Sequence, residues 1–174
     1  ERYGVKMEIL DAAESKRLEP SIKGDYEAGV LTHGAHYLRD PVRPIQKSVD
    51  KLVQLGGTYL QAELRQLRME SSYPEAVLTS GEVIKSDTVV LAAGIWSGTL
   101  AQSVGDRFPL ESERGYHVQY TGADVGLKRG LVDTSRGFAV SPVDGGLRIA
   151  GSVEFSGLKP PLNPRRTKVL DRHA

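Results

Sequence analysis

The sequence predicts a mixed α/β fold, with an antiparallel sheet in one part of the chain and an α/β segment built around a buried strand in another. Three observations support this prediction. Residues 89–93 form an unbroken apolar run, β-branched at its start, as in a strand buried on both faces. Residues 42–53 carry apolar side chains at helical spacing. Residues 108–155 contain several short β-type segments separated by turn residues.

The composition is that of an ordinary globular chain with one core or two lobes. It has 174 residues, of which 39% are hydrophobic and 26% are charged. The 23 basic and 22 acidic side chains leave no electrostatic footprint for nucleic acid. The absence of cysteine excludes disulfides and thiolate chemistry. No apolar run approaches the roughly 20 residues of a transmembrane segment, so we expect a soluble chain.

The first elements are a short strand at residues 5–10 and a helix that follows it directly. Asp11, with Glu14 three residues later, has the pattern of a capping box, which predicts a helix from Asp11 to about Leu18. Pro20 ends this helix, and a second short strand is expected at residues 28–32.

The next helix has the clearest boundaries. Asp40 is its expected N-cap, and Gly56-Gly57 closes it. Two prolines fall in the first turn, where a missing N–H costs nothing. The apolar residues of this helix lie on one stripe: Val42, Ile45, Val49, Leu52 and Val53.

The α/β segment continues with β-structure. Residues 58–69 predict a strand, and residues 76–84 a hairpin that turns at Ser80-Gly81. The interior strand at residues 87–93 follows. Gly94 then leads into a short helix at residues 98–104, which Gly105 terminates.

The C-terminal half predicts four antiparallel strands, at residues 115–120, 131–134, 137–141 and 147–155. The sequence Asp144-Gly145-Gly146 between the last two is a strong hairpin signal. A proline-rich linker and a helix from Arg165 to His173 complete the chain.

The segment VVLAAGIWSGTL (residues 89–100) resembles the strand and turn that meet the flavin in FAD-dependent oxidoreductases of the D-amino-acid oxidase type. This group includes D-amino-acid dehydrogenases, glycine oxidase and sarcosine oxidase. Residues 39–64, 108–120 and 144–155 resemble further segments of that family, in matching order. The family's G-x-G-x-x-G and its C-terminal Gly-x-Arg-Pro segment do not occur in the sequence. We therefore expect an internal fragment of a longer enzyme, which lacks parts of its parent chain.

The resemblance implies FAD as the cofactor and a division into three segments. Residues 1–40 and 106–174 would belong to a substrate domain with an antiparallel sheet. Residues 41–105 would be the middle portion of a split, Rossmann-like FAD-binding domain. The resemblance also implies a cytoplasmic enzyme, free or peripheral on the inner face of the cytoplasmic membrane.

Four residues are the predicted FAD contacts. By resemblance, the backbone of Gly94 lies near the flavin or the pyrophosphate, with Ala93 and Trp96 beside it. The main chain at Leu64 matches the position that contacts the adenine. The alternative for Gly94 is a plain strand-to-helix turn, and for Leu64 a core leucine.

Three residues are the predicted substrate contacts. Arg114 and Tyr116 share one face of a strand, and a guanidinium offers a substrate carboxylate a bidentate partner. Gly151 matches a glycine near the reactive edge of the flavin. The alternatives are an arginine at a strand end, a half-buried sheet tyrosine and a bulge glycine. Glu154 is interpreted as a solvated strand residue. No metal site is expected, because His33 and His36 have no further ligand nearby in sequence.

The implied reaction is oxidation of the Cα–N bond of a D-amino acid by FAD, followed by hydrolysis of the imine to a 2-oxo acid and ammonia. The partners would be the amino acid and an electron acceptor, either a quinone or oxygen. The segments RGYHVQY and LRIAGSVEF resemble bacterial D-amino-acid dehydrogenases more than oxidases. Two alternatives stay open: a glycine- or sarcosine-type oxidase, and an isolated substrate lobe that neither binds FAD nor has activity by itself.

Overall fold

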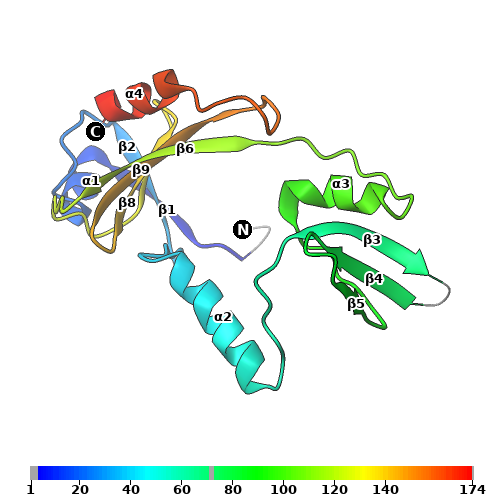
Figure 1. Cartoon of the computed structure of the whole chain (residues 1–174). Coiled ribbons are helices and arrows are strands. Elements are labelled where there is room, and N and C mark those ends of the chain that lie inside the picture. The colour runs from blue at the N-terminus through cyan, green and yellow to red at the C-terminus, as the bar shows by residue number, and fades with distance from the viewer. Residues whose placement is uncertain (1–3, 71–72, 174) are drawn as a thin grey trace. The chain divides into compact units, whose positions relative to one another are not determined.

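The computed structural model describes residues 4–70 and 73–173. It divides the chain into two units. The first unit consists of Glu1–Gln46, Arg114–Glu154 and Pro161–Ala174, and the second of Lys47–Glu113 and Phe155–Pro160. Both contain antiparallel sheets with helices (Figure 1). The predicted mixed α/β class is thus confirmed, whereas the assignment of three segments to substrate and FAD-binding domains stays a prediction.

The N-terminal part of the first unit is a two-stranded sheet with one short helix. Strand β1 (Met7–Asp11) pairs antiparallel with β2 (Ala28–Thr32), and α1 (Ala12–Leu18) lies between them in sequence. The Glu14 N–H donates to Asp11 Oδ1 at 2.8 Å, and the Asp11 N–H donates to Glu14 Oε2 at 3.0 Å. The predicted capping box is confirmed.

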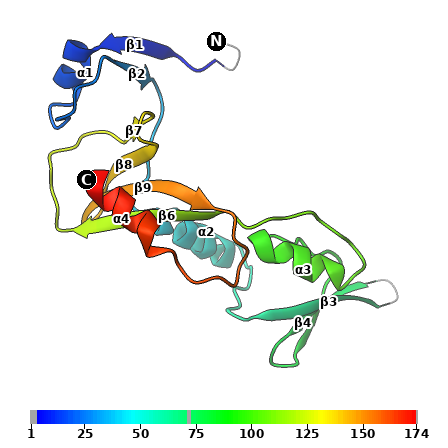
Figure 2. The same cartoon turned by 90° about the horizontal axis from the view of Figure 1, so that it is seen from above.

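The main sheet of the first unit has the strand order β6-β9-β8-β7, with all neighbours antiparallel. The strands are β6 (Arg114–Thr121), β7 (Leu131–Asp133), β8 (Phe138–Val143) and β9 (Gly146–Glu154). Helix α4 (Pro164–His173) lies along β6 and β9 in both views (Figures 1 and 2). These elements and the hairpin at Asp144-Gly145-Gly146 lie where the sequence predicts them.

The two faces of this sheet differ in character. Tyr116, Phe138, Ile149 and Leu170 of α4 form the core on one face, and the Tyr120 hydroxyl donates to Asp171 of the helix. Strand side chains alternate, so the residues between these core positions point the other way. We call that side the distal face. By register it contains His117, Gln119, Thr121, Val132, Ala139, Ser141, Val143, Arg148 and Ala150.

The turn between β7 and β8 is held by Asp133. Its Oδ1 accepts hydrogen bonds from the Ser135 hydroxyl (2.7 Å) and the backbone N–H groups of Ser135 and Arg136, while the Tyr26 hydroxyl and the Arg136 guanidinium donate to Oδ2. These donors, the Ser135 hydroxyl foremost, hold the pKa of Asp133 well below its usual range. The residue therefore fastens the loop that carries Tyr26 to the sheet.

Asp133 should make the stability of the protein depend on pH. Because its pKa is lower in the folded state, its contribution is complete above the unfolded pKa of about 3.9 and declines as the pH falls further. In Asp133→Asn this contribution is absent at every pH. Thermal unfolding from pH 7 to pH 3 should show a gap in Tm between wild type and variant that narrows below about pH 4. Asp25→Asn, at an exposed position, is the control. A gap that stays constant with pH would contradict this role.

The second unit contains a three-stranded sheet in the order β3-β4-β5, formed by β3 (Leu64–Glu70), β4 (Tyr73–Leu78) and β5 (Val83–Lys85). Helix α3 (Ser97–Gln102) packs on β3, where the Ser103 hydroxyl accepts from the Leu67 N–H at 2.9 Å. Gly105 follows α3 with a φ of 90°, which confirms the predicted stop. The predicted strand at residues 58–69 begins only at Leu64.

Helix α2 (Val42–Gln54) spans the boundary between the units in sequence. Asp40 Oδ1 accepts from the N–H groups of Val42 and Arg43, so the predicted cap is confirmed. The predicted apolar stripe of α2 lies on one side of the helix, but most of its side chains are exposed. None of the helices in the described residues has the length and hydrophobicity that a bilayer span requires.

The predicted interior strand at residues 87–93 is wrong. This segment forms no strand, and Val90 is 84% exposed. A buried strand needs neighbours on both sides to bond its N–H and C=O groups. In residues 4–70 and 73–173, no strand pairs with this segment. Its apolar composition is compatible with a buried strand, but pairing is a property of the neighbours, which the local sequence does not contain.

Candidate functional site

Three of the four predicted FAD contacts lie in one turn of the second unit. Gly94 and Trp96 bound the 3-10 turn η1 (Gly94–Trp96), and Ala93 precedes it. The Ala93 N–H donates to the Ser97 hydroxyl at 3.0 Å, which closes the turn. Leu64 lies elsewhere in the unit, half-buried at the start of β3.

The geometry of this turn is compatible with contact to a planar ligand. Gly94 has a φ of 57°, and a Cβ at this position would meet no atom within 4 Å, so space is open in front of its backbone. The first N–H groups of a helical turn have no acceptor within it. Trp96 is 62% exposed and offers an aromatic face. The residues therefore fit an FAD contact, and that contact stays a prediction.

A pocket of about 200 Å³ lies next to this turn and shares Ile95 with it. Its other walls come from α3 and from the segments before β6 and after β9: Gly98, Thr99, Gln102, Phe108, Leu110, Glu111, Ser112, Gly157 and Leu158. Pockets that enclose drug-sized ligands begin at about 300 Å³. This pocket alone is thus too small to enclose a dinucleotide.

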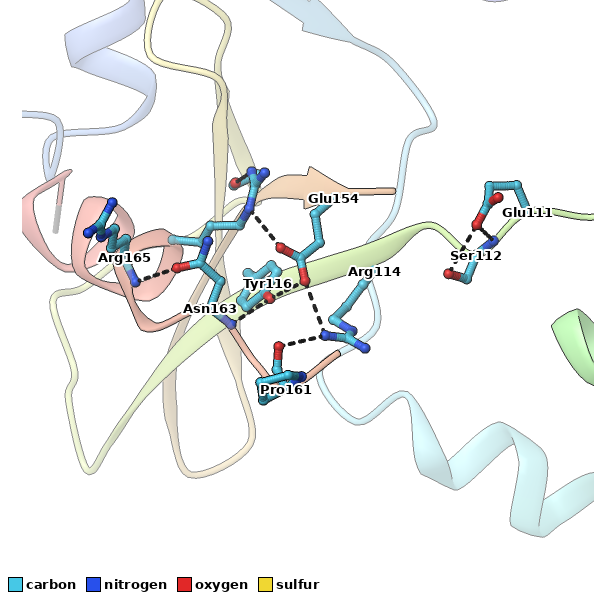
Figure 3. Close-up of polar contacts among 10 residues, drawn as sticks. Glu111, Ser112, Arg114, Tyr116, Glu154, Pro161, Asn163 and Arg165 are labelled. Carbon is cyan, nitrogen blue, oxygen red and sulfur yellow. Dashed lines mark hydrogen bonds and ion pairs between the residues drawn. The ribbon is translucent and has the colours of Figure 1, made fainter. Parts of the chain in front are cut away.

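The three predicted substrate residues lie in the first unit. Two of them, Arg114 and Tyr116, contact Glu154 (Figure 3). Glu154 Oε1 accepts from the Tyr116 hydroxyl at 2.7 Å and from Arg114 Nη1 at 3.1 Å. Its Oε2 accepts from Arg166 Nε at 3.2 Å. The Tyr116 oxygen also accepts from the Asn163 N–H at 3.0 Å. We call these residues, Arg114, Tyr116, Glu154, Asn163 and Arg166, the Glu154 cluster.

Two residues of the cluster, Arg114 and Tyr116, are predicted from the sequence to share one face of a strand. The other three, Glu154, Asn163 and Arg166, are not predicted as ligands. The interpretation of Glu154 as solvated is wrong, since its side chain is 11% exposed and receives two guanidinium groups. The one sequence signal for this pairing was charge, because Glu154 is an acidic residue of a strand and the basic pair Arg165-Arg166 follows it in the chain. Their pairing depends on α4 docking against the sheet, which no local pattern encodes.

Arg114 and Tyr116 point toward Glu154. The Arg114 guanidinium also donates to the Pro161 carbonyl at 3.2 Å, and the buried Tyr116 hydroxyl has both a donor and an acceptor partner. Substrate binding by either residue stays a prediction. For Arg114, it requires that the guanidinium exchange Glu154 for the substrate carboxylate.

A β-bulge shapes the strand beside the cluster. Tyr116 pairs with Gly151 and Gly115 with Val153, so Ser152 is the extra residue of β9. Ser152 has a φ of 61°, unusual for a residue with a side chain, and its hydroxyl accepts from Arg166 Nη1 at 2.6 Å. Gly151 packs against the start of β8, where a Cβ would lie 2.7 Å from the Gly137 oxygen. Substrate contact by Gly151 stays a prediction.

Two substitutions of Ser152 separate backbone strain from its hydrogen bond. Ser152→Ala loses the hydrogen bond to Arg166 and keeps the unfavourable φ, so the free energy of unfolding should fall by about 1–2 kcal/mol. Ser152→Gly loses the same bond but relieves the backbone, and should be about 1 kcal/mol more stable than the alanine variant. Urea unfolding of both variants checks this order. Equal stability of the two would show that the bulge is unstrained.

Comparison with known proteins identifies the family to which this chain is similar. A family model described as FAD dependent oxidoreductase matches residues 1–174. A D-amino-acid oxidase of Bradyrhizobium diazoefficiens is 33% identical over 172 residues, which are 99% of this chain and 41% of that protein. The chain thus spans less than half of this relative's length.

Solved structures show the same fold. Glycine oxidase from Bacillus cereus matches with a TM-score of 0.67 at 16% identity, over 99% of this chain and 47% of that one. Iminodiacetate oxidase from Chelativorans matches with a TM-score of 0.66 at 22% identity, over 96% of this chain and 46% of that one. At these identities the matches establish the fold alone.

Proposed function

Because the chain belongs to the FAD dependent oxidoreductase family, we propose that the protein carrying it oxidises the Cα–N bond of D-amino acids. The observation that carries this proposal is the match to a D-amino-acid oxidase along 99% of the chain. The structural neighbours are named glycine oxidase and iminodiacetate oxidase, and these names describe oxidation of related amines, which supports the same class of reaction.

When bound, FAD supplies the chemistry by accepting a hydride from Cα of the substrate. The protein then has to hold the carboxylate and admit the amine in its neutral form, so no protein base is required. The imine product is hydrolysed by water to the 2-oxo acid and ammonia. We assign Ala93, Gly94, Trp96 and Leu64 to FAD contact. Arg114, Tyr116 and Gly151 remain the residues predicted from sequence for the substrate.

The electron acceptor distinguishes a dehydrogenase from an oxidase. The segments around Arg114 and Gly151 resemble dehydrogenases, which favours a quinone as acceptor, whereas the relative from Bradyrhizobium diazoefficiens is named an oxidase, which favours oxygen. We propose a cytoplasmic reaction, and a quinone acceptor would place it at the inner face of the membrane. A glycine-type oxidase is the second candidate, favoured by the glycine oxidase fold match.

Substrate oxidation by the full polypeptide that carries these 174 residues, loaded with FAD, tests the proposal. D-Alanine, L-alanine, glycine and iminodiacetate are offered in turn, with either oxygen or a soluble quinone analogue, and 2-oxo acid and ammonia are measured. We expect turnover of D-alanine in preference to glycine and none of L-alanine. Faster turnover of glycine would favour the second candidate. No turnover of any of these amines would overturn the proposal.

A further inference from the structure

Helix α4 carries a row of basic side chains on the side that does not pack on the sheet. The packed side is marked by Leu170, which is 2% exposed in the core, and by Arg166, which donates to Glu154. Three exposed basic residues follow one another at spacings of three and four residues, which places them together on the opposite side of the helix. We call them the basic stripe: Arg165, Lys168 and Arg172.

The surrounding carboxylates do not neutralise the basic stripe. Helix α4 packs on β6 and β9, and the carboxylates of these three elements are Glu154 and Asp171. Glu154 accepts from Arg114 and Arg166, and the bond with the Tyr120 hydroxyl turns Asp171 toward the sheet. Within residues 4–70 and 73–173, no cation of the stripe forms an ion pair. Like charges at this spacing repel one another, and an anionic partner would relieve that repulsion.

Aliphatic side chains accompany the cations. Val169, on the same side of the helix, is 45% exposed, and Leu162, just before α4, is 72% exposed. The stripe has no aromatic side chain on which a nucleic-acid base could stack. A bilayer surface offers phosphates to the cations and the edge of the acyl region to the aliphatic groups. A nucleic acid offers the phosphates alone, so the combination favours a lipid surface.

We propose that the outer side of α4 binds the surface of an anionic lipid bilayer, with the basic stripe on the lipid phosphates. The whole chain has 23 basic and 22 acidic residues, so this attraction is local to the helix. Three cations give weak, reversible binding rather than a stable anchor. The binding stands on the helix and not on the proposed function. Only its use rests on that function, because a quinone acceptor dissolved in the bilayer would then lie close to the enzyme.

Co-sedimentation of the FAD-loaded full polypeptide with lipid vesicles tests this proposal. Vesicles of phosphatidylcholine and phosphatidylglycerol in equal parts should bind the protein, and vesicles of phosphatidylcholine alone should not. Each lysine or arginine near an anionic surface strengthens binding about fivefold, so replacing all three residues of the stripe by glutamine should weaken it about 100-fold. Added salt should weaken wild-type binding, because it screens exposed charges.

Two control variants separate the stripe from net charge. The first removes three exposed cations of the same unit that lie outside α4: Lys16→Gln, Arg17→Gln and Lys23→Gln. The second, Arg165→Lys with Arg172→Lys, keeps the charge of the stripe. Both should bind anionic vesicles as wild type does. Equally weak binding by the first control and the stripe variant would show that net charge alone decides, and would overturn the proposal.

The outcomes also separate this proposal from the proposed function. Oxidation of D-alanine by a wild-type protein that does not bind anionic vesicles would overturn the lipid surface alone. Binding through the stripe, in a protein that oxidises no amino acid, would overturn the function and support the surface. Binding to a DNA duplex but not to vesicles would assign the stripe to nucleic acid and overturn the proposal. If circular dichroism shows that the triple stripe variant is unfolded, the three single glutamine variants decide, and wild-type affinity in all of them overturns the proposal.

Discussion

Glu154→Ala is expected to lower the free energy of unfolding by about 3–5 kcal/mol, because it leaves two partly buried guanidinium groups without their carboxylate. The Tyr116 hydroxyl loses its acceptor at the same time. Chemical unfolding of the full polypeptide, followed by circular dichroism, measures this loss.

Glu154→Gln is the matched control. It keeps the shape of the side chain and an oxygen for Tyr116 but removes the charge, so the expected loss is smaller, about 1–3 kcal/mol. A loss below about 1 kcal/mol for Glu154→Ala would mean that the cluster contributes no more than an exposed ion pair. In that case the ion pair between Glu154 of β9 and Arg166 of α4 would not be what holds the helix on the sheet.

Gly151→Val is expected to destabilise the protein by about 3 kcal/mol, because its Cβ would overlap the backbone of the neighbouring strand. A Cβ at residue 151 would lie 2.7 Å from the Gly137 oxygen and 3.0 Å from Phe138 Cα. Both are backbone atoms, which cannot move aside as a flexible side chain can. Urea unfolding of the variant gives the magnitude.

Gly115→Ala provides the comparison, because a Cβ at Gly115 meets no atom within 4 Å and its φ is not in the left-handed region. Its stability should stay within about 0.5 kcal/mol of wild type. If Gly151→Val were as stable as Gly115→Ala but bound substrate poorly, Gly151 would be a ligand contact, as the sequence resemblance implies.

Local signals predicted most of the elements correctly. The Asp11 and Glu14 capping box, the Asp40 cap of α2, the Gly105 stop of α3 and the glycine hairpin before β9 all act within a few residues. Each satisfies backbone groups of its own segment, so its sequence is sufficient to specify it.

Features that depend on distant partners were not predictable in this way. The apolar run at residues 89–93 has the composition of a buried strand but no neighbouring strand in the described residues. Glu154 is polar in sequence yet shielded by α4 and its two arginines. Arg148 lies between Leu147 and Ile149, and period-two alternation alone would have placed it opposite the core. That its Nε is buried without a hydrogen-bond partner becomes visible only in the folded sheet.

Flavin retention is the most direct test of the proposal that this chain is part of an FAD enzyme acting on D-amino acids. The full polypeptide is incubated with FAD, freed of unbound cofactor, and examined by visible absorbance before and after anaerobic addition of D-alanine. We expect a retained flavin band that D-alanine bleaches and L-alanine does not. A polypeptide that retains no flavin, or a band that D-alanine leaves unchanged, would contradict the proposal.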